Sequence, residues 1–279
     1  MIYIKDNIGL DLPEKNLARS PLQYPGGKSK AVRQICALIP RDTKELISPF
    51  LGGAWVELAL DQIGVKVYGF DFFQPVVDFW QEAIHDAEYL SRVVRNMWLL
   101  PTTVEDFKAA QGMKFGNIVD RAAQFYYLNR ASFSGRGFSG SMCKKQKGYK
   151  ESNREFLSKF KVNHMRVYFQ DFRDTINRNG DDIFMYLDPP YAIGKNSQYY
   201  GVDGDMHDEF PHEELVALLK KKKNWLMSYN NSEYIYDLFK DFRIVVPDGW
   251  SYGMSPGAEK SREVFILGDG IPEVIVEEN

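Results

Sequence analysis

Cysteine and histidine are scarce in this chain. The 279 residues include two cysteines, Cys36 and Cys143, which lie far apart and outside any CxxC pair. A disulfide framework and a four-cysteine zinc site are therefore excluded, and a reducing, intracellular environment is expected. The four histidines are scattered and form no HExxH pattern, so we expect no metal.

Long apolar runs are also missing. No stretch approaches the roughly 18 uncharged apolar residues of a membrane helix, and the first 14 residues are interrupted by charges such as Lys5 and Asp6, where a signal peptide would be apolar. We expect no membrane association and a cytoplasmic location. The composition, 44% hydrophobic and 26% charged, is that of a globular chain with one sizeable domain, or one domain plus an insertion.

Net charge is small, −3 overall, and taken globally it argues against a nucleic-acid partner. Its distribution argues the other way, because ten basic and only two acidic residues lie between Arg130 and Arg166. This basic segment carries +8 and the remainder −11, an asymmetry typical of a polyanion-binding face. A solvated lysine-rich loop is the alternative. The second basic run, Lys220 to Lys223, is interpreted as a helix C-terminus.

Hydrophobic periodicity predicts an α/β fold. Residues 45–50 and 65–70 are predicted strands on either side of a predicted helix, 54–63. This βαβ unit implies a parallel sheet. Another helix is predicted over 31–39, and a further five strands are predicted at 165–169, 183–187, 225–229, 242–246 and 263–267.

Between about residues 75 and 161 the pattern changes to helices and polar loops. Helices are predicted over 76–99, 103–111 and 118–128, followed by a Gly/Ser-rich stretch at 132–140 and the lysines of the basic segment. We interpret this block as an insertion. The domain hypothesis is a catalytic domain formed by 1–74 and 166–279, with an inserted target-recognition domain at 75–165.

The turn after the first strand, Phe50-Leu51-Gly52-Gly53, fits a nucleotide-binding βα loop. Glycines let the backbone approach a ligand, and the following helix presents free N–H groups. Asp71 ends the next strand, where an acidic side chain can accept hydrogen bonds from ribose hydroxyls; the alternative is an Asp that only caps a turn. Gly27-Lys28-Ser29 is not a P-loop, because that motif needs glycine at position 22, which is Leu.

The most informative motif is Asp188-Pro189-Pro190-Tyr191, which directly follows the apolar strand 183–187. It falls at the carboxyl edge of the sheet, where α/β folds bind ligands. A carboxylate and a carbonyl on a rigid proline loop can accept hydrogen bonds from both N–H groups of an exocyclic NH₂ group. Tyr191 offers a flat face on which a base turned out of a duplex can stack.

In chain order, these motifs resemble a Dam-type DNA adenine-N6 methyltransferase, a family with its recognition domain between the cofactor motifs and the catalytic motif. Residues 21–28 resemble its PLxWxGGK element, Phe50 to Gly53 its FxGxG loop, and Asp188 to Tyr191 its catalytic motif. Phe169 to Phe172 resembles the element that holds the cofactor's adenine. Ser228-Tyr229-Asn230 and the 262–266 strand resemble the closing segment.

The resemblance implies a Rossmann-like class I methyltransferase fold, a mixed, mainly parallel sheet with helices on both faces and an inserted, mainly helical DNA-recognition domain. It implies transfer of a methyl group from S-adenosylmethionine to adenine N6 in double-stranded DNA with base flipping, and it allows a cognate restriction endonuclease that acts separately. Asp188, Pro189, Pro190 and Tyr191 would be catalytic. The cofactor residues would be Tyr24, Gly26, Gly27, Lys28, Phe50, Gly52, Gly53, Asp71, Phe72, Asp171, Phe172 and Asp188.

DNA contacts are expected from Arg130, Ser132, Ser134, Arg136, Lys144, Lys145, Lys147 and Lys150. Leu128 to Gly135 resembles the family's LNRxxFNG element, with Ser134 in place of Asn, and the arginine-bearing hairpin that usually follows is replaced. The target sequence therefore stays open, GATC included.

A C5-cytosine enzyme is excluded, because it would need a Pro-Cys nucleophile and neither cysteine follows a proline. Three alternative functions remain. N4-cytosine and RNA amino-methyltransferases usually carry Ser or Asn where this chain has Asp188, and both stay as alternatives. A catalytically silent nucleic-acid-binding protein on the same fold is the third.

Overall fold

The computed structural model describes residues 9–100, 102–143, 149–191, 210–246 and 263–272. Its centre is a seven-stranded sheet with the order β3-β2-β1-β4-β5-β7-β6. All seven strands lie where the sequence predicts them, at Glu45–Ser48 (β1), Lys66–Asp71 (β2), Met165–Phe169 (β3), Phe184–Leu187 (β4), Trp225–Asn230 (β5), Arg243–Val245 (β6) and Glu263–Leu267 (β7).

Strands β1 to β5 are mutually parallel, and β7 runs antiparallel to both β5 and β6. The chain moves outward from β1 in both directions, through β2 and β3 on one side and β4 and β5 on the other. Such a reversal of strand order opens a crevice at the carboxyl edge, where ligands bind in doubly wound sheets. The mixed, mainly parallel α/β fold is confirmed.

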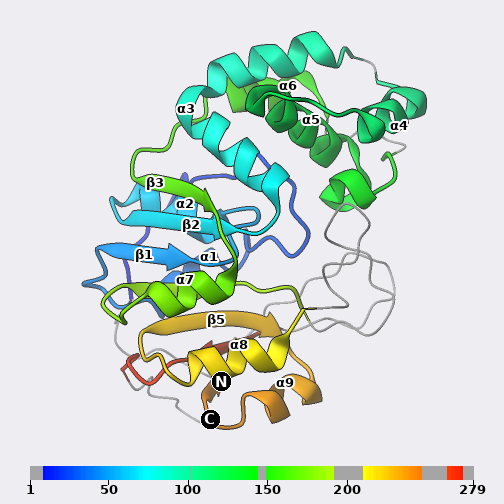
Figure 1. Ribbon diagram of the computed structural model, residues 1–279. Helices are drawn as coiled ribbons and strands as arrows, with labels where there is room; N and C mark the ends of the chain where they lie inside the picture. Colours follow the sequence, from blue (N-terminus) through cyan, green and yellow to red (C-terminus); the bar gives the residue numbers. More distant parts are fainter. Residues whose placement is uncertain (1–8, 101, 144–148, 192–209, 247–262, 273–279) are drawn as a thin grey trace.

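Helices cover both faces of the sheet, because neighbouring strand residues point to opposite sides. Leu46, Leu226 and Phe265 face the helices α1 (Val32–Cys36), α2 (Trp55–Gln62) and α3 (Gln74–Met97). The next residue of each strand, Ile47, Met227 and Ile266, faces the other layer. That layer contains α7 (Phe172–Arg178), α8 (His212–Leu219) and α9 (Glu233–Leu238) (Figure 1). Burial on both faces explains why the central strands β4 and β5 are buried along almost their whole length rather than alternating.

Two helix predictions need adjustment. The helix predicted over 31–39 ends at Cys36, and residues up to Ile39 form tighter turns before Pro40, since a residue that precedes proline disfavours helix. The helix predicted over 76–99 is α3, which bends at Asp86 (φ −155°, ψ 85°). The Asp86 side chain accepts a hydrogen bond from the Tyr89 N–H at 2.8 Å and so caps the second half of the helix.

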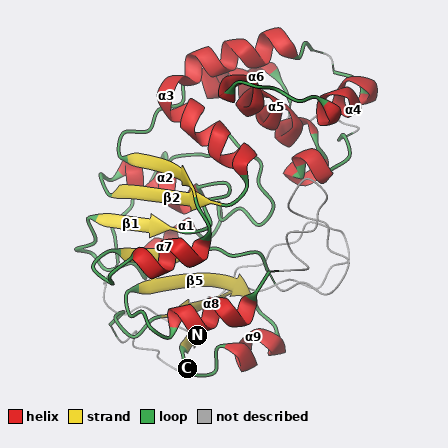
Figure 2. Cartoon of the chain, viewed as in Figure 1, coloured by secondary structure: helices red, strands yellow, loops and turns green. Residues whose placement is uncertain are grey.

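The bend in α3 directs the chain away from the sheet into an all-helical part (Figure 2). This part also contains α4 (Val104–Gly112), α5 (Ile118–Ala131) and α6 (Glu151–Ser158). The rings of Trp98 and Tyr127 stack at 4.9 Å, and the Tyr149 hydroxyl donates to the Trp98 carbonyl oxygen at 2.7 Å. Buried residues of α5 belong to the same hydrophobic cluster as one face of the sheet. Domain boundaries at 75 and 165 stay a prediction.

No helix among the described residues is long and apolar enough to cross a membrane.

Candidate functional site

A cavity of about 420 Å³ opens at the carboxyl edge, between the ends of β1, β2 and β4. All four residues predicted to be catalytic and all twelve predicted to bind a cofactor line it. The structure thus brings together side chains that lie up to 167 positions apart (191 minus 24). The volume of the cavity lies within the range of roughly 300–1,000 Å³ that is typical of small-molecule sites.

The glycine turn after β1 supports one wall of the cavity. A Cβ atom at Gly52 (φ +44°) would lie 2.9 Å from the Tyr24 ring, and one at Gly53 would lie 2.8 Å from the Tyr24 Cβ atom. Tyr24 packs closely on the turn only because both residues are glycine. The Trp80 indole N–H donates to the Gly52 carbonyl oxygen at 2.9 Å and holds the turn from the other side.

Asp71, at the end of β2, ties two loops together. Its Oδ2 accepts from the Gly52 N–H at 2.9 Å and its Oδ1 from the Phe73 N–H at 2.9 Å. Burial raises the pKa of Asp71 from 3.8 to about 6, and the backbone hydrogen bonds oppose this rise. The interpretation as a turn-capping Asp is thus correct in part, and the same side chain also lines the cavity.

The far wall comes from the start of α7. Asp171 caps this helix by accepting from the Arg173 N–H at 2.8 Å, and it forms an ion pair with the Arg173 guanidinium at 2.9 Å. Phe172 is 5% exposed and packs on Phe50 (ring centroids 5.4 Å apart) and Phe210 (5.3 Å). Phe72 is 55% exposed at the rim and stacks on Phe169 at 5.2 Å.

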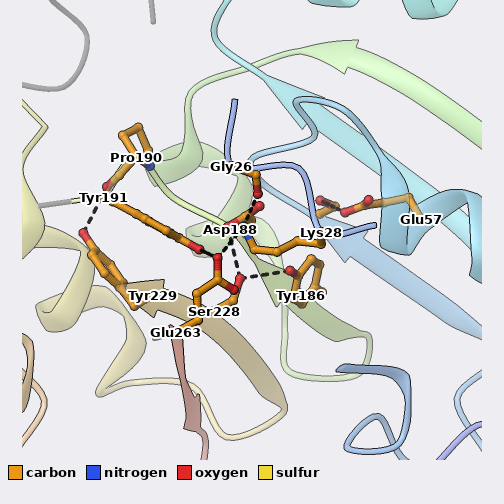
Figure 3. Close-up of polar contacts among 11 residues, drawn as sticks. Gly26, Lys28, Glu57, Tyr186, Asp188, Pro190, Tyr191, Ser228, Tyr229 and Glu263 are labelled. Carbon is orange, nitrogen blue, oxygen red and sulfur yellow. Dashed lines mark hydrogen bonds and ion pairs between the residues drawn. The ribbon is translucent and has the colours of Figure 1, made fainter. Parts of the chain in front are cut away.

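Lys28 and Asp188 form a buried ion pair in the middle of the site (Figure 3). The Lys28 Nζ atom lies 2.7 Å from Asp188 Oδ1, donates to the Gly26 carbonyl oxygen at 2.6 Å, and is 3% exposed at the side chain. Ser228 Oγ donates to the same Oδ1 at 3.0 Å and is itself 3.0 Å from the Tyr186 hydroxyl oxygen. Burial raises the pKa of Asp188, and Lys28 opposes the rise.

The second oxygen of Asp188 is positioned differently. Within the described ranges, no hydrogen bond or ion pair involves Oδ2, while Oδ1 has two partners. Asp188 lines the cavity and is 23% exposed at its side chain. One oxygen therefore anchors the carboxylate to the protein, and the other remains available to a ligand.

The Tyr191 ring is held from three directions. It stacks on Tyr229 with centroids 5.6 Å apart, lies 4.9 Å from Lys28 Nζ, and donates its hydroxyl proton to Glu263 Oε1 at 2.5 Å. Tyr229 in turn donates to the Pro190 carbonyl oxygen at 3.1 Å. These contacts connect residues 188–191, which were predicted to be catalytic, to β5 and β7 (Figure 3).

Sequence reasoning missed two acidic residues here. Glu57, in the first turn of α2, is 2% exposed, lines the cavity and accepts from Ser48 Oγ at 2.6 Å. Glu263, the first residue of β7, is 4% exposed and lies 3.5 Å from Lys28 Nζ. Burial raises the pKa of each to about 7. The sequence did point to the strand that begins at Glu263, as part of the closing segment, but assigned the side chain no role.

Of the residues predicted to contact DNA, the five that the structure describes do not line the cavity. Ser132 is 2% exposed, and its hydroxyl donates to the Asn129 carbonyl oxygen at 3.1 Å and accepts from the Gly137 N–H at 2.9 Å. It therefore stabilises the loop that contains Ser134 (φ +58°) and Arg136, both of them half-buried. Arg130 is largely desolvated, which lowers its pKa. Lys150 is exposed, and Lys144, Lys145 and Lys147 lie outside the described residues.

One member of the basic segment has a structural role. Arg154 is 7% exposed, forms an ion pair with Glu151, and contacts the Trp98 carbonyl oxygen at 3.4 Å. It therefore contributes to the helical core rather than to a polyanion-binding face. Among the residues placed by the structure, no group of three or more His, Cys, Asp or Glu is arranged to hold a metal ion.

Comparison with known proteins adds independent information. The model of the family described as D12 class N6 adenine-specific DNA methyltransferase matches residues 24–251. The type II methyltransferase M1.LlaDCHI of Lactococcus lactis subsp. cremoris is 25% identical over 250 residues, which cover 80% of this chain and 84% of the relative. The type II methyltransferase M2.HphI of Haemophilus parahaemolyticus is 22% identical over 280 residues, 75% of this chain and 83% of the relative.

The modification methylase StsI of Streptococcus sanguinis is a longer relative. It is 25% identical over 210 residues, which cover 68% of this chain but only 31% of StsI. The chain thus corresponds to about a third of that protein.

Proposed function

Because the chain belongs to the D12 class N6 adenine-specific DNA methyltransferase family, we propose that it transfers the methyl group of S-adenosylmethionine to the N6 amino group of adenine in double-stranded DNA. The family assignment makes the chain an adenine-specific DNA methyltransferase, and relatives named as modification methylases agree with it. Methylation of DNA adenine is accordingly favoured over methylation of cytosine N4, methylation of RNA, and a catalytically silent binding protein. The cofactor, the role of each residue and the duplex substrate are parts of the proposal.

The observation that carries the mechanism is the asymmetry of Asp188. Its Oδ1 is anchored by Lys28 and Ser228, and its Oδ2 is available in the cavity. Adenine N6 is a poor nucleophile because its lone pair is delocalised into the ring. Hydrogen bonds from the two N6–H groups, one accepted by Oδ2 and the other by the Pro189 carbonyl oxygen, would favour a tetrahedral nitrogen with a localised lone pair. Catalysis then rests on positioning and electrostatics.

The target base has to leave the duplex to reach Asp188. Tyr191 supplies the stacking surface, and its contacts with Tyr229 and Glu263 keep its ring in place before the base arrives. Preorganisation of this kind reduces the entropic cost of binding.

The cavity fits S-adenosylmethionine, which supplies a methyl group on a positively charged sulfur. Asp71 would accept from the ribose hydroxyls, Asp171 from the adenine amino group, and Phe72 and Phe172 would pack beside that ring. Tyr24, Gly26, Gly27, Lys28, Phe50, Gly52 and Gly53 line the remainder. The fit is supported by the set of acceptors, since the carboxylates of Asp71, Asp171 and Asp188 line the same cavity.

Recognition of DNA is assigned to residues 75–165, as a domain inserted between 1–74 and 166–279. Arg136 and Ser134, on the loop after α5, would reach base edges, because arginine pairs bidentately with guanine. Arg130 and Ser132 would support that loop. Lys144, Lys145, Lys147 and Lys150 would contact phosphates, which position the protein without reading sequence.

Protection of DNA against a separate cognate endonuclease is the biological role that we propose, on the model of the type II relatives. The protein would act in the cytoplasm of a bacterial or phage-infected cell, where its DNA substrate lies, without a metal or a membrane.

The deciding experiment is transfer of a tritiated methyl group from S-adenosylmethionine to duplexes of varied sequence, followed by mapping of the methylated bases. N6-methyladenine at a defined site in duplex DNA is expected. Equal transfer to RNA, or methylation of cytosine, would contradict the proposal.

A further inference from the structure

Glu263 reaches the active site by an unusual route. It is the first residue of β7, the strand that runs antiparallel to β5 and pairs Glu263 with Asn230. Parallel strands deliver their last residues to the carboxyl edge of a sheet, whereas an antiparallel strand delivers its first. Glu263 therefore enters at the same edge as Asp188, and its carboxylate lies at the hydroxyl end of Tyr191 (Figure 3).

The Glu263 side chain contacts two active-site groups with one oxygen. Oε1 accepts from the Tyr191 hydroxyl at 2.5 Å and lies 3.5 Å from Lys28 Nζ. The other oxygen, Oε2, is buried without a hydrogen-bond partner in the part of the chain that the structure describes. Leaving a buried carboxylate oxygen unsatisfied is costly, and such a cost points to a function for the charge beyond packing.

The charges around Lys28 are unbalanced. One ammonium group lies between two carboxylates, at 2.7 Å from Asp188 and 3.5 Å from Glu263, and its side chain is 3% exposed. Above the Glu263 pKa of about 7, with both acids ionised, this three-residue group carries a net charge of −1. Because water is excluded, that charge acts over a longer range than it would at the surface.

We propose that Glu263 is a positioning residue for methyl transfer, which orients Tyr191 and Lys28 around Asp188 and supplies the excess negative charge of the group. This inference rests on the proposed function. As the N6 lone pair forms its bond to the methyl carbon, the carbon–sulfur bond would break with its electron pair on sulfur, and N6 would become positive before it loses one proton, through Asp188 Oδ2, to solvent. A negative charge fixed beside Asp188 stabilises this developing positive charge and affects the transition state more than the bound substrate.

Two substitutions separate the contributions of shape and charge. Glu263→Gln keeps an oxygen that can accept from Tyr191 but removes the charge, whereas Glu263→Ala removes both. For Glu263→Gln we expect kcat about 10–100-fold lower, with Kd for S-adenosylmethionine and KM for DNA changed by less than about twofold. For Glu263→Ala we expect the same loss in kcat and, in addition, a raised KM for DNA, because Tyr191 is no longer oriented.

The seating of the target base can be followed with 2-aminopurine at the mapped adenine, since its fluorescence rises when it leaves the stack. Glu263→Gln should keep the wild-type signal and Glu263→Ala should reduce it. Glu233→Gln, at an exposed position in the first turn of α9, is the matched control and should behave as wild type in every assay.

Wild-type kcat in Glu263→Gln would overturn the inference, and so would a loss of cofactor affinity or thermal stability that parallels the loss of kcat. These outcomes differ from failure of the proposed function, in which the wild-type protein itself would methylate no DNA adenine.

Discussion

The Asn129 side chain forms a two-way hydrogen-bonded pair with the Gln23 backbone. Asn129 Oδ1 accepts from the Gln23 N–H at 2.9 Å, and Nδ2 donates to the Gln23 carbonyl oxygen at 2.8 Å. The same Nδ2 donates to the Gly135 carbonyl oxygen at 3.0 Å. One fully buried amide thus connects the loop proposed to read DNA with the residue that precedes Tyr24, which lines the proposed cofactor site.

Asn129→Ala is the first prediction. It removes three hydrogen bonds and leaves backbone groups of Gln23 and Gly135 unsatisfied, so we expect the free energy of unfolding to fall by about 2–4 kcal/mol. Chemical denaturation measures this change. Asn163→Ala, which alters an exposed asparagine, is the control, and equal stability of the two variants would show that the pairing contributes nothing.

Asp188→Ala should abolish methyl transfer and leave DNA binding largely intact. Loss of a polar group that acts in the transition state typically lowers the rate by about 10²–10³-fold. Single-turnover methylation and a DNA-binding titration test the two halves of the statement. Asp182→Ala is the control. It changes an exposed carboxylate just before β4, the strand that Asp188 follows, and should keep full activity. More than half of wild-type turnover in Asp188→Ala would remove the residue from the mechanism.

Asp71→Ala should weaken binding of S-adenosylmethionine by about 1.5–3 kcal/mol, the usual range for hydrogen bonds to a charged group. Part of this loss would come from the turn at Gly52, which Asp71 holds. Calorimetry on the folded variant measures the change, with Asp174→Ala at an exposed position of α7 as the control. Unchanged affinity would exclude Asp71 from the site.

The buried carboxyl group of Glu57 should make the free energy of unfolding depend on pH. Its pKa rises from 4.5 to about 7 on folding, so between these two values the unfolded chain has lost a proton that the folded protein retains. The free energy of unfolding therefore falls as the pH rises through this window, by about 3 kcal/mol in total. Glu57→Gln removes this contribution.

Denaturation without ligand at pH 5 and pH 8 tests it. The wild-type protein should lose more stability between these pH values than Glu57→Gln does. Glu88→Gln, at an exposed position of α3, should follow the wild type. Identical pH dependence in Glu57→Gln and the wild type would mean that Glu57 is not desolvated.

The lysines of the basic segment give the last prediction. Replacing Lys144, Lys145, Lys147 and Lys150 with Ala should weaken binding to every duplex about equally, and the slope of log affinity against log salt should become shallower by about 0.9 for each phosphate that is no longer neutralised. Replacing Lys220, Lys221 and Lys223 with Ala should change neither the affinity for DNA nor the slope. Arg136→Ala, by contrast, should alter which sequences are methylated. A wild-type salt slope in the fourfold variant would identify the segment as a solvated loop.

Much of the architecture could be predicted because it depends on local patterns. All seven strands are apolar runs bounded by polar or turn residues, and the confirmed order of β1, α2 and β2 follows from one βαβ unit. The short helices α6, α7 and α9 were not predicted. Each spans little more than two turns at most, too short for periodicity to separate it from a loop.

The cavity lining could be predicted for residues that sit in motifs, such as Asp71 and Asp188. Glu57 and Glu263 could not, since each lies within an apolar segment where a single acid shows no pattern. Their role emerges only when the sheet places α2 and β7 beside Lys28. Ser132 and Arg154 illustrate the opposite error, in which polar residues expected at a surface are used inside the helical part.

The antiparallel strand β7 has a consequence for how the enzyme comes into being on the ribosome. Lys28 and Glu263 are 235 positions apart (263 minus 28), and at about 5–20 residues per second the ribosome needs roughly 10–50 s to connect them. During that interval the nascent chain already contains Lys28, Asp188 and Tyr191, but the Tyr191 hydroxyl lacks the carboxylate that accepts its hydrogen bond in the folded protein. The contact between Tyr191 and Glu263 therefore forms late in synthesis, after the residues at the other strand ends have been made.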